Sequence, residues 1–185
     1  MSDIDFKALA AEAKAMTGLT PHREQICITM GDLLRPHLPA VTEEFYATLQ
    51  TIPKAAKMLE GRVVRLKETH LKWLHSVFTG PYDEEYCKLM YHVGDVHVKV
   101  NLPSELMAAG IILIGNHLLP VISSTCEDAT RCSETTAAVN AVLGYSLVVM
   151  QQAYQTSSLS AEIDRVLRIT GMSRTLFNNL AAAYH

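Results

Sequence analysis

The sequence lacks the signatures of several large functional classes. Its 185 residues carry 16 Lys and Arg against 19 Asp and Glu, a net charge of −3, so we expect no partnership with nucleic acid or an anionic membrane. The four cysteines include no CxxC pair, so the sequence lacks the usual motif of a zinc site or a thiol–disulfide centre. No HExxH, GxSxG or glycine-rich phosphate loop is present. We therefore do not expect this chain to be an enzyme with polar catalytic machinery.

A secretory leader and a clear membrane span are also missing. The segment over residues 1–16 carries acidic side chains and has no apolar leader core. The longest apolar stretch, residues 106–122, contains Asn116 and His117 and is shorter than the roughly 20 apolar residues that a bilayer requires. We therefore expect a cytoplasmic protein in which this stretch is a buried core helix.

Almost every segment has a 3.6-residue apolar period, and none alternates for long enough to indicate a strand. Proline, glycine and capping residues divide the chain into helices expected over residues 5–16, 22–35, 40–50, 62–78, 83–100, 103–123 and 133–156. Ser157, Ser158 and Ser160 are expected to end the last of these, and a helix with a narrow apolar stripe follows from Ser160. The sequence predicts an all-α fold with a domain over residues 1–156 and a C-terminal helical linker or tail over residues 157–185.

One histidine lies on an apolar helix face. In the helix expected over residues 83–100, Met90, Val93, His97 and Val100 share one face, so His97 is expected to point into the core. A lone core histidine is most often a structural residue whose ring is hydrogen-bonded to a neighbour. On the residues alone, this interpretation stays open beside a functional one.

Four stretches together give a resemblance to a known family: VTEEFYATL (41–49), RLKETHLKWLHSVFTGPYDEEY (65–86), VGDVHVKVNLPSEL (93–106) and LLPVI (118–122). Their order and spacing resemble the globin domain of the globin-coupled sensors, bacterial haem proteins that place a globin ahead of a signalling output. The resemblance covers about residues 20–156. It implies a globin-like helical sandwich around one haem b, with an extra N-terminal helix and a C-terminal linker helix.

The resemblance also implies roles for individual residues. His97 matches the proximal ligand of the haem iron, which binds as a neutral imidazole. Tyr46 matches the distal tyrosine that donates a hydrogen bond to bound O2, while Thr69 and Leu66 match two other distal positions. His70 is a candidate sixth ligand of the iron. The remaining residues expected around the haem are Phe45, Trp73, Met90, Val93 and Val100.

Two further expectations concern local geometry. Phe45 and Tyr46 are neighbours, and we expect only one of the two rings to face the haem. Asn101 occupies a position at which the family has glycine, and both residues tolerate the left-handed conformation at the end of a helix.

The function that this resemblance implies is a sensor of a diatomic gas, O2 and also CO or NO, that relays ligand state to an output domain or signalling partner. The apolar helices over residues 103–123 and 133–156 are expected to join two copies into a homodimer. Two alternatives remain open. One is a stand-alone O2-binding globin, and the other is a haem-free globin-like regulatory module in which His97 is a core histidine.

Overall fold

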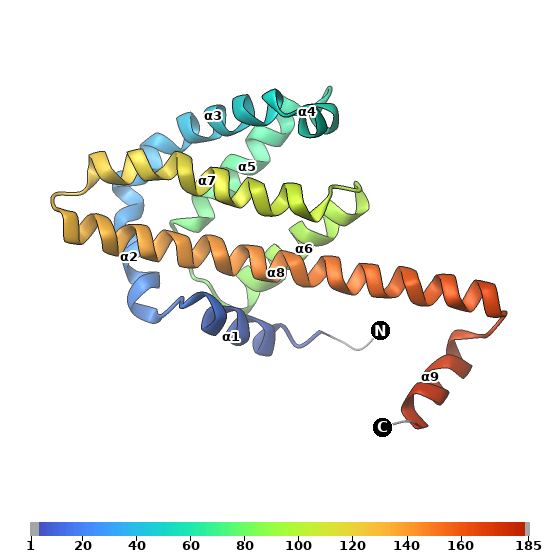
Figure 1. Ribbon diagram of the computed structural model, residues 1–185. Coiled ribbons are helices and arrows are strands. Elements are labelled where there is room, and N and C mark those ends of the chain that lie inside the picture. The colour runs from blue at the N-terminus through green and yellow to red at the C-terminus, as the bar shows by residue number, and fades with distance from the viewer. Residues whose placement is uncertain (1–3, 184–185) are drawn as a thin grey trace.

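The computed structural model describes residues 4–183, and this part of the chain consists of helices joined by short turns, with no strand (Figure 1). The prediction of an all-α fold is confirmed. The elements are α1 (Phe6–Thr17), α2 (Pro21–Leu34), the short 3-10 helix η1 (Arg35–His37), α3 (Leu38–Thr51), α4 (Pro53–Leu59), α5 (Val63–Val77), α6 (Glu84–Lys99), α7 (Ser104–Thr125), α8 (Ala129–Thr170) and α9 (Arg174–Ala183).

Capping side chains fix where several of these helices begin. The carboxylate of Asp5 accepts a hydrogen bond of 2.9 Å from the backbone N–H of Ala8, and the hydroxyl of Thr20 accepts one of 3.3 Å from that of Arg23. The carboxylate of Asp83 accepts two hydrogen bonds of 3.1 Å from the first turn of α6. Because these caps are visible in the sequence, the starts of α1, α2 and α6 fall within one residue of the predicted positions.

The long helix α8 forms the spine of the fold, and α1, α2, α6 and α7 all pack on it (Figure 1). On the far side of α7, α3 packs against both α7 and α5. The crossing of α6 with α8 is close, because a Cβ atom added at Gly94 would lie 2.5 Å from the carbonyl oxygen of Met150. Only glycine fits this crossing without a shift of the backbone, and it sets the position of α6, which carries His97, on α8.

The apolar helix α7 is, among the described residues, the one helix long and apolar enough to cross a membrane. One face of it is buried in the fold, through Met107, Ile114 and Leu118. On the opposite face the side chain of Ile112 is 62% exposed and that of Leu119 is 41% exposed. The predicted core helix is therefore buried on one face only, and its other face is free to meet a partner.

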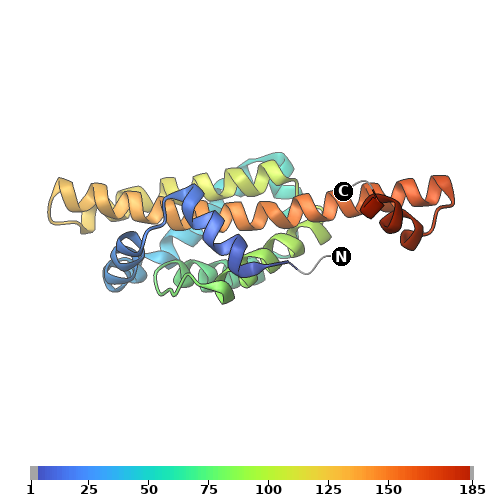
Figure 2. The same cartoon turned by 90° about the horizontal axis from the view of Figure 1, so that it is seen from below.

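The end of α8 corrects one expectation. The helix does not stop at Ser157, Ser158 or Ser160 but continues to Thr170, and Figure 2 shows its last part extending beyond the other helices. A serine in a helix interior costs at most about 0.7 kcal/mol relative to alanine, so three serines do not end a helix that is otherwise well formed. The helix ends at Gly171, whose φ of 68° is left-handed.

The segment over residues 157–185 therefore begins as the projecting part of α8. The short helix α9 turns back after Gly171, and the guanidinium of Arg174 pairs with the carboxylate of Asp164 on α8. Residues 184–185 lie outside the described part of the chain, as do residues 1–3 of the predicted domain. The division into a domain and a linker stays a prediction.

Candidate functional site

The imidazole of His70, on α5, lies among aromatic rings from α3 and α5. It stacks on the ring of Phe45, with 4.7 Å between centroids and 11° between planes. Tyr46 meets it edge-on at 5.7 Å, and Trp73 lies tilted against it at 5.6 Å. Consecutive residues of a helix point about 100° apart, so Phe45 and Tyr46 can contact the same ring from two directions. The structure thus brings both rings to His70, and the expectation that only one of them faces a haem stays a prediction.

The two nitrogens of His70 have different surroundings. Nδ1 is 3.1 Å from the hydroxyl oxygen of Thr42, a buried residue of α3. Nε2 is buried and has no hydrogen-bond partner among the described residues. Burial disfavours the charged ring and lowers the pKa of His70 to about 4. At neutral pH His70 is therefore a neutral imidazole with one unsatisfied nitrogen.

His97 lies in the last turn of α6. Its Nδ1 atom is buried and has no hydrogen-bond partner in the described part of the chain, and burial lowers the pKa of the ring. The helix ends as the sequence predicted, with Asn101 in the left-handed conformation at a φ of 55°. The backbone N–H of Leu102 then donates to the carbonyl oxygen of His97 at 2.9 Å. This cap fixes the backbone from which the His97 side chain projects.

A hydrogen bond links the two helices that carry these histidines. The indole N–H of Trp73, on α5, donates to the sulfur of the fully buried Met90, on α6, at 3.1 Å. His70 precedes Trp73 by one helical turn, and His97 follows Met90 by two turns on the same face of α6. The Trp73–Met90 contact therefore holds α5 and α6 together close to the turns that carry His70 and His97.

Tyr46 brings a phenol to the same cluster. The side chain is buried, and its hydroxyl makes no hydrogen bond to any residue that the structure describes. Burial raises the pKa of Tyr46 to about 12, so the hydroxyl stays protonated at any physiological pH. It is a hydrogen-bond donor that is available to a ligand.

The other residues singled out in the sequence divide into two groups. Leu66 and Val93 are half-buried and pack against the apolar core. Thr69 and Val100 are exposed, and the Thr69 hydroxyl donates to the backbone carbonyl of Arg65 at 3.0 Å. The structure does not bring Thr69 and Val100 into the cluster, because the turn that directs His70 inward places Thr69 about 100° away, towards solvent.

Thr42 belongs to the cluster but was not among the residues singled out in the sequence. A signal for it exists, since Thr42 precedes Phe45 by three residues and Tyr46 by four, and residues at these spacings share a helix face. A buried threonine on such a face needs a hydrogen-bond partner. The identity of that partner, His70 of another helix, follows only from the tertiary structure.

The described residues offer two imidazole ligands, one from α5 and one from α6. Among the described residues, no group of three or more His, Cys, Asp or Glu side chains is placed to hold a bare metal ion. Any metal at this site would therefore need most of its ligands from a bound cofactor.

Comparison with solved structures identifies the class of fold. The structure is similar to the globin domain of a globin-coupled sensor from Geobacter sulfurreducens, with a TM-score of 0.72 and 25% sequence identity. This match covers 78% of the present chain and 96% of the other. The fold is thus that of a globin. The chain belongs to the protoglobin family, whose model matches residues 6–160.

Other similar proteins include the diguanylate cyclase DosC. The protein from Escherichia coli strain K12 is 26% identical over 130 residues, which are 68% of this chain and 28% of that protein. DosC from Shigella flexneri gives the same identity, over 34% of its length. The ferric globin domain of E. coli DosC has a TM-score of 0.68 at 21% identity, which shows the fold alone. The chain spans about a third of the length of these curated relatives.

Proposed function

We propose that this globin is a haem-based sensor domain that binds O2, and also CO or NO, and relays the ligand state to a signalling output. The observation that carries the proposal is the pair of buried imidazoles, His70 and His97, each with a ring nitrogen that lacks a partner among the described residues. Such atoms are rare in native proteins and call for an explanation such as an ion or cofactor. Burial keeps both rings neutral, which is the state in which imidazole binds iron.

The residues present fit a haem group. His97 would be the proximal ligand of its iron, and His70 is a candidate sixth ligand. Haem b is the form proposed, because the sequence has no CxxC pair for covalent attachment. When bound, the haem supplies an iron atom to which a diatomic gas can coordinate. Water would be excluded from that position by the buried and half-buried apolar side chains expected around the haem, namely Phe45, Leu66, Trp73, Met90 and Val93.

Tyr46 would read which gas is bound. Bound O2 carries partial negative charge, and the protonated phenol of Tyr46 can donate a hydrogen bond to it. Bound CO carries little charge and gains little from the same donor. The site would therefore favour O2 over CO relative to a site lined only by hydrocarbon.

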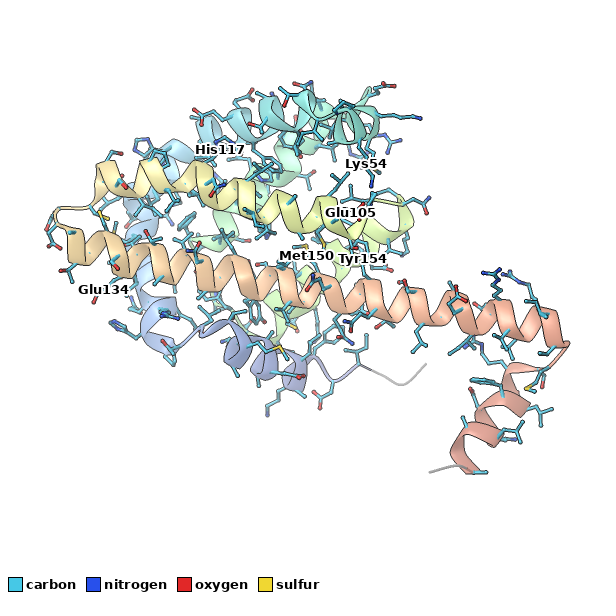
Figure 3. The ribbon with its side chains drawn as sticks, in the orientation of Figure 1. Lys54, Glu105, His117, Glu134, Met150 and Tyr154 are labelled. Atoms are coloured by element: carbon cyan, nitrogen blue, oxygen red, sulfur yellow. The ribbon has the colours of Figure 1, made fainter. Side chains whose placement is uncertain are left out.

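The contact between α6 and α8 supports a sensor over a stand-alone globin. Gly94, three residues before His97, lies against the backbone of Met150 on α8. The hydroxyl of Tyr154, also on α8, donates to the carbonyl oxygen of Leu102 at 2.9 Å, and Figure 3 shows both α8 residues. From there α8 continues without a break to Thr170. A shift of α6 on ligand binding would be carried along α8 to its projecting end.

The output would be met at this projecting end, by an attached domain or by a separate partner in the cytoplasm. The relative DosC is, by its name, a diguanylate cyclase, and the match to it spans only part of that protein. We therefore propose that the globin domain itself is not catalytic and that any enzymatic output lies elsewhere.

The absorption spectrum of the purified protein tests haem binding. We expect a Soret band, either as isolated or after addition of haemin. A colourless protein that takes up no haemin would contradict the proposal and favour the haem-free regulatory module.

Hydrogen exchange tests the relay. Amide exchange over residues 150–170 should differ between the deoxygenated and the O2-bound protein, because the proposed shift of α6 alters the packing of α8. Haem binding with identical exchange in both states would instead support a stand-alone O2-binding globin.

A further inference from the structure

The hydrogen bond between Thr42 and His70 is the main polar contact of an otherwise aromatic cluster. Thr42 is a 3% exposed residue of α3, and its hydroxyl oxygen lies 3.1 Å from Nδ1 of His70. The hydroxyl of Thr51, on the same helix, donates to a backbone carbonyl one turn earlier, and that of Thr48 does so as well as lying 3.3 Å from Nε2 of His117 on α7. Thr42 thus directs its hydroxyl to another helix.

This bond bears on which nitrogen of His70 carries the proton. A neutral imidazole has one N–H and one nitrogen with a free lone pair. If the Thr42 hydroxyl donated to Nδ1, the proton would sit on Nε2, a buried atom with no acceptor among the described residues. Buried N–H groups without an acceptor are rare in native proteins. With the proton on Nδ1, the N–H donates to Thr42, and Nε2 presents a lone pair instead.

The aromatic neighbours keep His70 in this orientation. Phe45 covers one face of the ring at 4.7 Å, while Tyr46 and Trp73 contact it at 5.7 Å and 5.6 Å. A ring packed on several sides loses little further freedom when it binds a metal. Metal-ligating histidines almost always donate the other ring N–H to a fixed acceptor, which sets the tautomer and the ring orientation. Thr42 is placed to be that acceptor.

We propose that Thr42 is a positioning residue that accepts a hydrogen bond from Nδ1–H of His70 and so presents Nε2 of His70 to the haem iron as its sixth ligand. The inference rests on the proposed function. It has a consequence for gas binding, because O2 or CO must displace His70 before it can bind. The apparent affinity for gas then falls with the fraction of protein in which His70 is detached. Thr42 would set that fraction.

The test uses the full haem-loaded chain in its ferric and ferrous, gas-free forms. Absorption and ferric electron paramagnetic resonance spectra give the ratio of six-coordinate low-spin to five-coordinate high-spin haem. Thr42→Val keeps the shape of the side chain but removes the hydroxyl, and it should lower this ratio about tenfold, the usual scale for loss of an outer-shell partner. The affinity for CO should rise by up to the same factor.

Matched variants separate positioning from packing. Thr42→Ser keeps the hydroxyl and should retain the low-spin form. Thr48→Val, on the same helix and also beside a histidine, His117, should leave the ratio unchanged. In a His70→Leu background the low-spin form should be absent, and Thr42→Val should then have no further effect. If Thr42→Val fails to fold, Thr42→Ala replaces it with the same expected loss.

A second measurement reads the tautomer directly. Nitrogen-15 NMR of the diamagnetic, CO-saturated ferrous protein reports the protonated nitrogen of His70 after CO has displaced it. We expect the proton on Nδ1. A proton on Nε2, or an equal low-spin ratio in wild type and Thr42→Val, would overturn the inference. Wild-type haem that is entirely five-coordinate would also overturn it while leaving haem binding intact, whereas a chain that takes up no haem would remove both proposals.

Discussion

His97 and His117 show how contacts separate a candidate ligand from a structural histidine. Both ring nitrogens of His117, which is labelled in Figure 3, have partners. Nδ1 is 3.3 Å from the carboxylate of Glu44, and Nε2 is 3.3 Å from the hydroxyl of Thr48. The buried Nδ1 of His97 has none in the described part of the chain. Both histidines lie on helices that have an apolar face, so the sequence alone distinguishes them only through the family resemblance.

At the residue scale, His97→Ala should abolish stable haem binding in the ferrous protein. The variant removes the proposed proximal imidazole, and alanine offers the iron no ligand. The ferrous absorption spectrum measures the outcome, with His117→Ala as a control that should keep the wild-type spectrum. A normal five-coordinate ferrous spectrum in His97→Ala, without added imidazole, would show that another residue holds the iron.

Tyr46→Phe should speed the dissociation of O2 by about ten- to a hundredfold. A hydrogen bond to a charged partner contributes about 1.5–3 kcal/mol, and each 1.4 kcal/mol is about a factor of ten in rate. Stopped-flow displacement of O2 measures the change, and CO dissociation is the control. Equal O2 off-rates would assign Tyr46 to packing alone, while parallel changes for O2 and CO would indicate altered access to the pocket.

The residues proposed to lie on the gas-binding side of the haem show how far single residues could be predicted from the sequence. The sequence placed Tyr46 and His70 in the same region, and the structure brings them together. It also singled out Thr69, which is exposed. A shift of one residue along a helix changes direction by about 100°, so a small uncertainty in register decides between pocket and solvent. Thr42 was missed because its partner lies 28 residues away, a contact that no local pattern encodes.

At the scale of elements, the starts of α1, α2 and α6 were predictable, whereas α8 begins at Ala129 instead of residue 133 and continues past Ser160. Side-chain caps such as Asp83 act within one turn of the chain and leave a local signal. The continuation of α8 past Ser157 depends on many small helix propensities that together exceed the cost of three serines. The crossing of α6 over α8 could not be predicted either. Its only trace in the sequence is Gly94, and the contact of this residue with Met150 depends on the tertiary structure.

That crossing predicts that Gly94→Ala destabilises the fold by about 1–3 kcal/mol, the usual cost of overpacking. The new Cβ atom would lie 2.5 Å from the carbonyl oxygen of Met150 and 2.9 Å from Cβ of Ala153, so α6 must move off α8. Urea denaturation followed by circular dichroism measures the free energy of unfolding.

Gly115→Ala, on α7, is the matched control for this substitution. Its Cβ atom would have its nearest neighbours at 3.7 Å and 3.8 Å, which is ordinary contact. Alanine is also the better helix former, so the control should be neutral or stabilising by up to about 1 kcal/mol. Equal stability of Gly94→Ala and wild type would mean that the crossing is looser than the structure indicates.

At the scale of the whole molecule, α7 and the projecting end of α8 leave apolar surface uncovered. Ile112 and Leu119 are seven residues apart on the outer face of α7, and Leu159, Val166 and Ile169 are exposed on α8. Exposed apolar surface of this extent is typical of interaction sites. A symmetric pair of chains would cover the outer face of α7 and complete a four-helix arrangement from α7 and α8 of each copy.

The protein should therefore be a homodimer at micromolar concentration, and Ile112→Glu should weaken the dimer at least about tenfold. The substitution places an unpaired carboxylate in the centre of the proposed interface, and burial of an unpaired charge costs several kcal/mol. Sedimentation measures the mass. The control is Leu33→Glu, which places the same charge at an exposed apolar residue of α2 and should leave the dimer intact. A single species of 20.4 kDa in the wild type would contradict the dimer. A dimer that survives Ile112→Glu would move the interface away from α7 and towards the projecting end of α8.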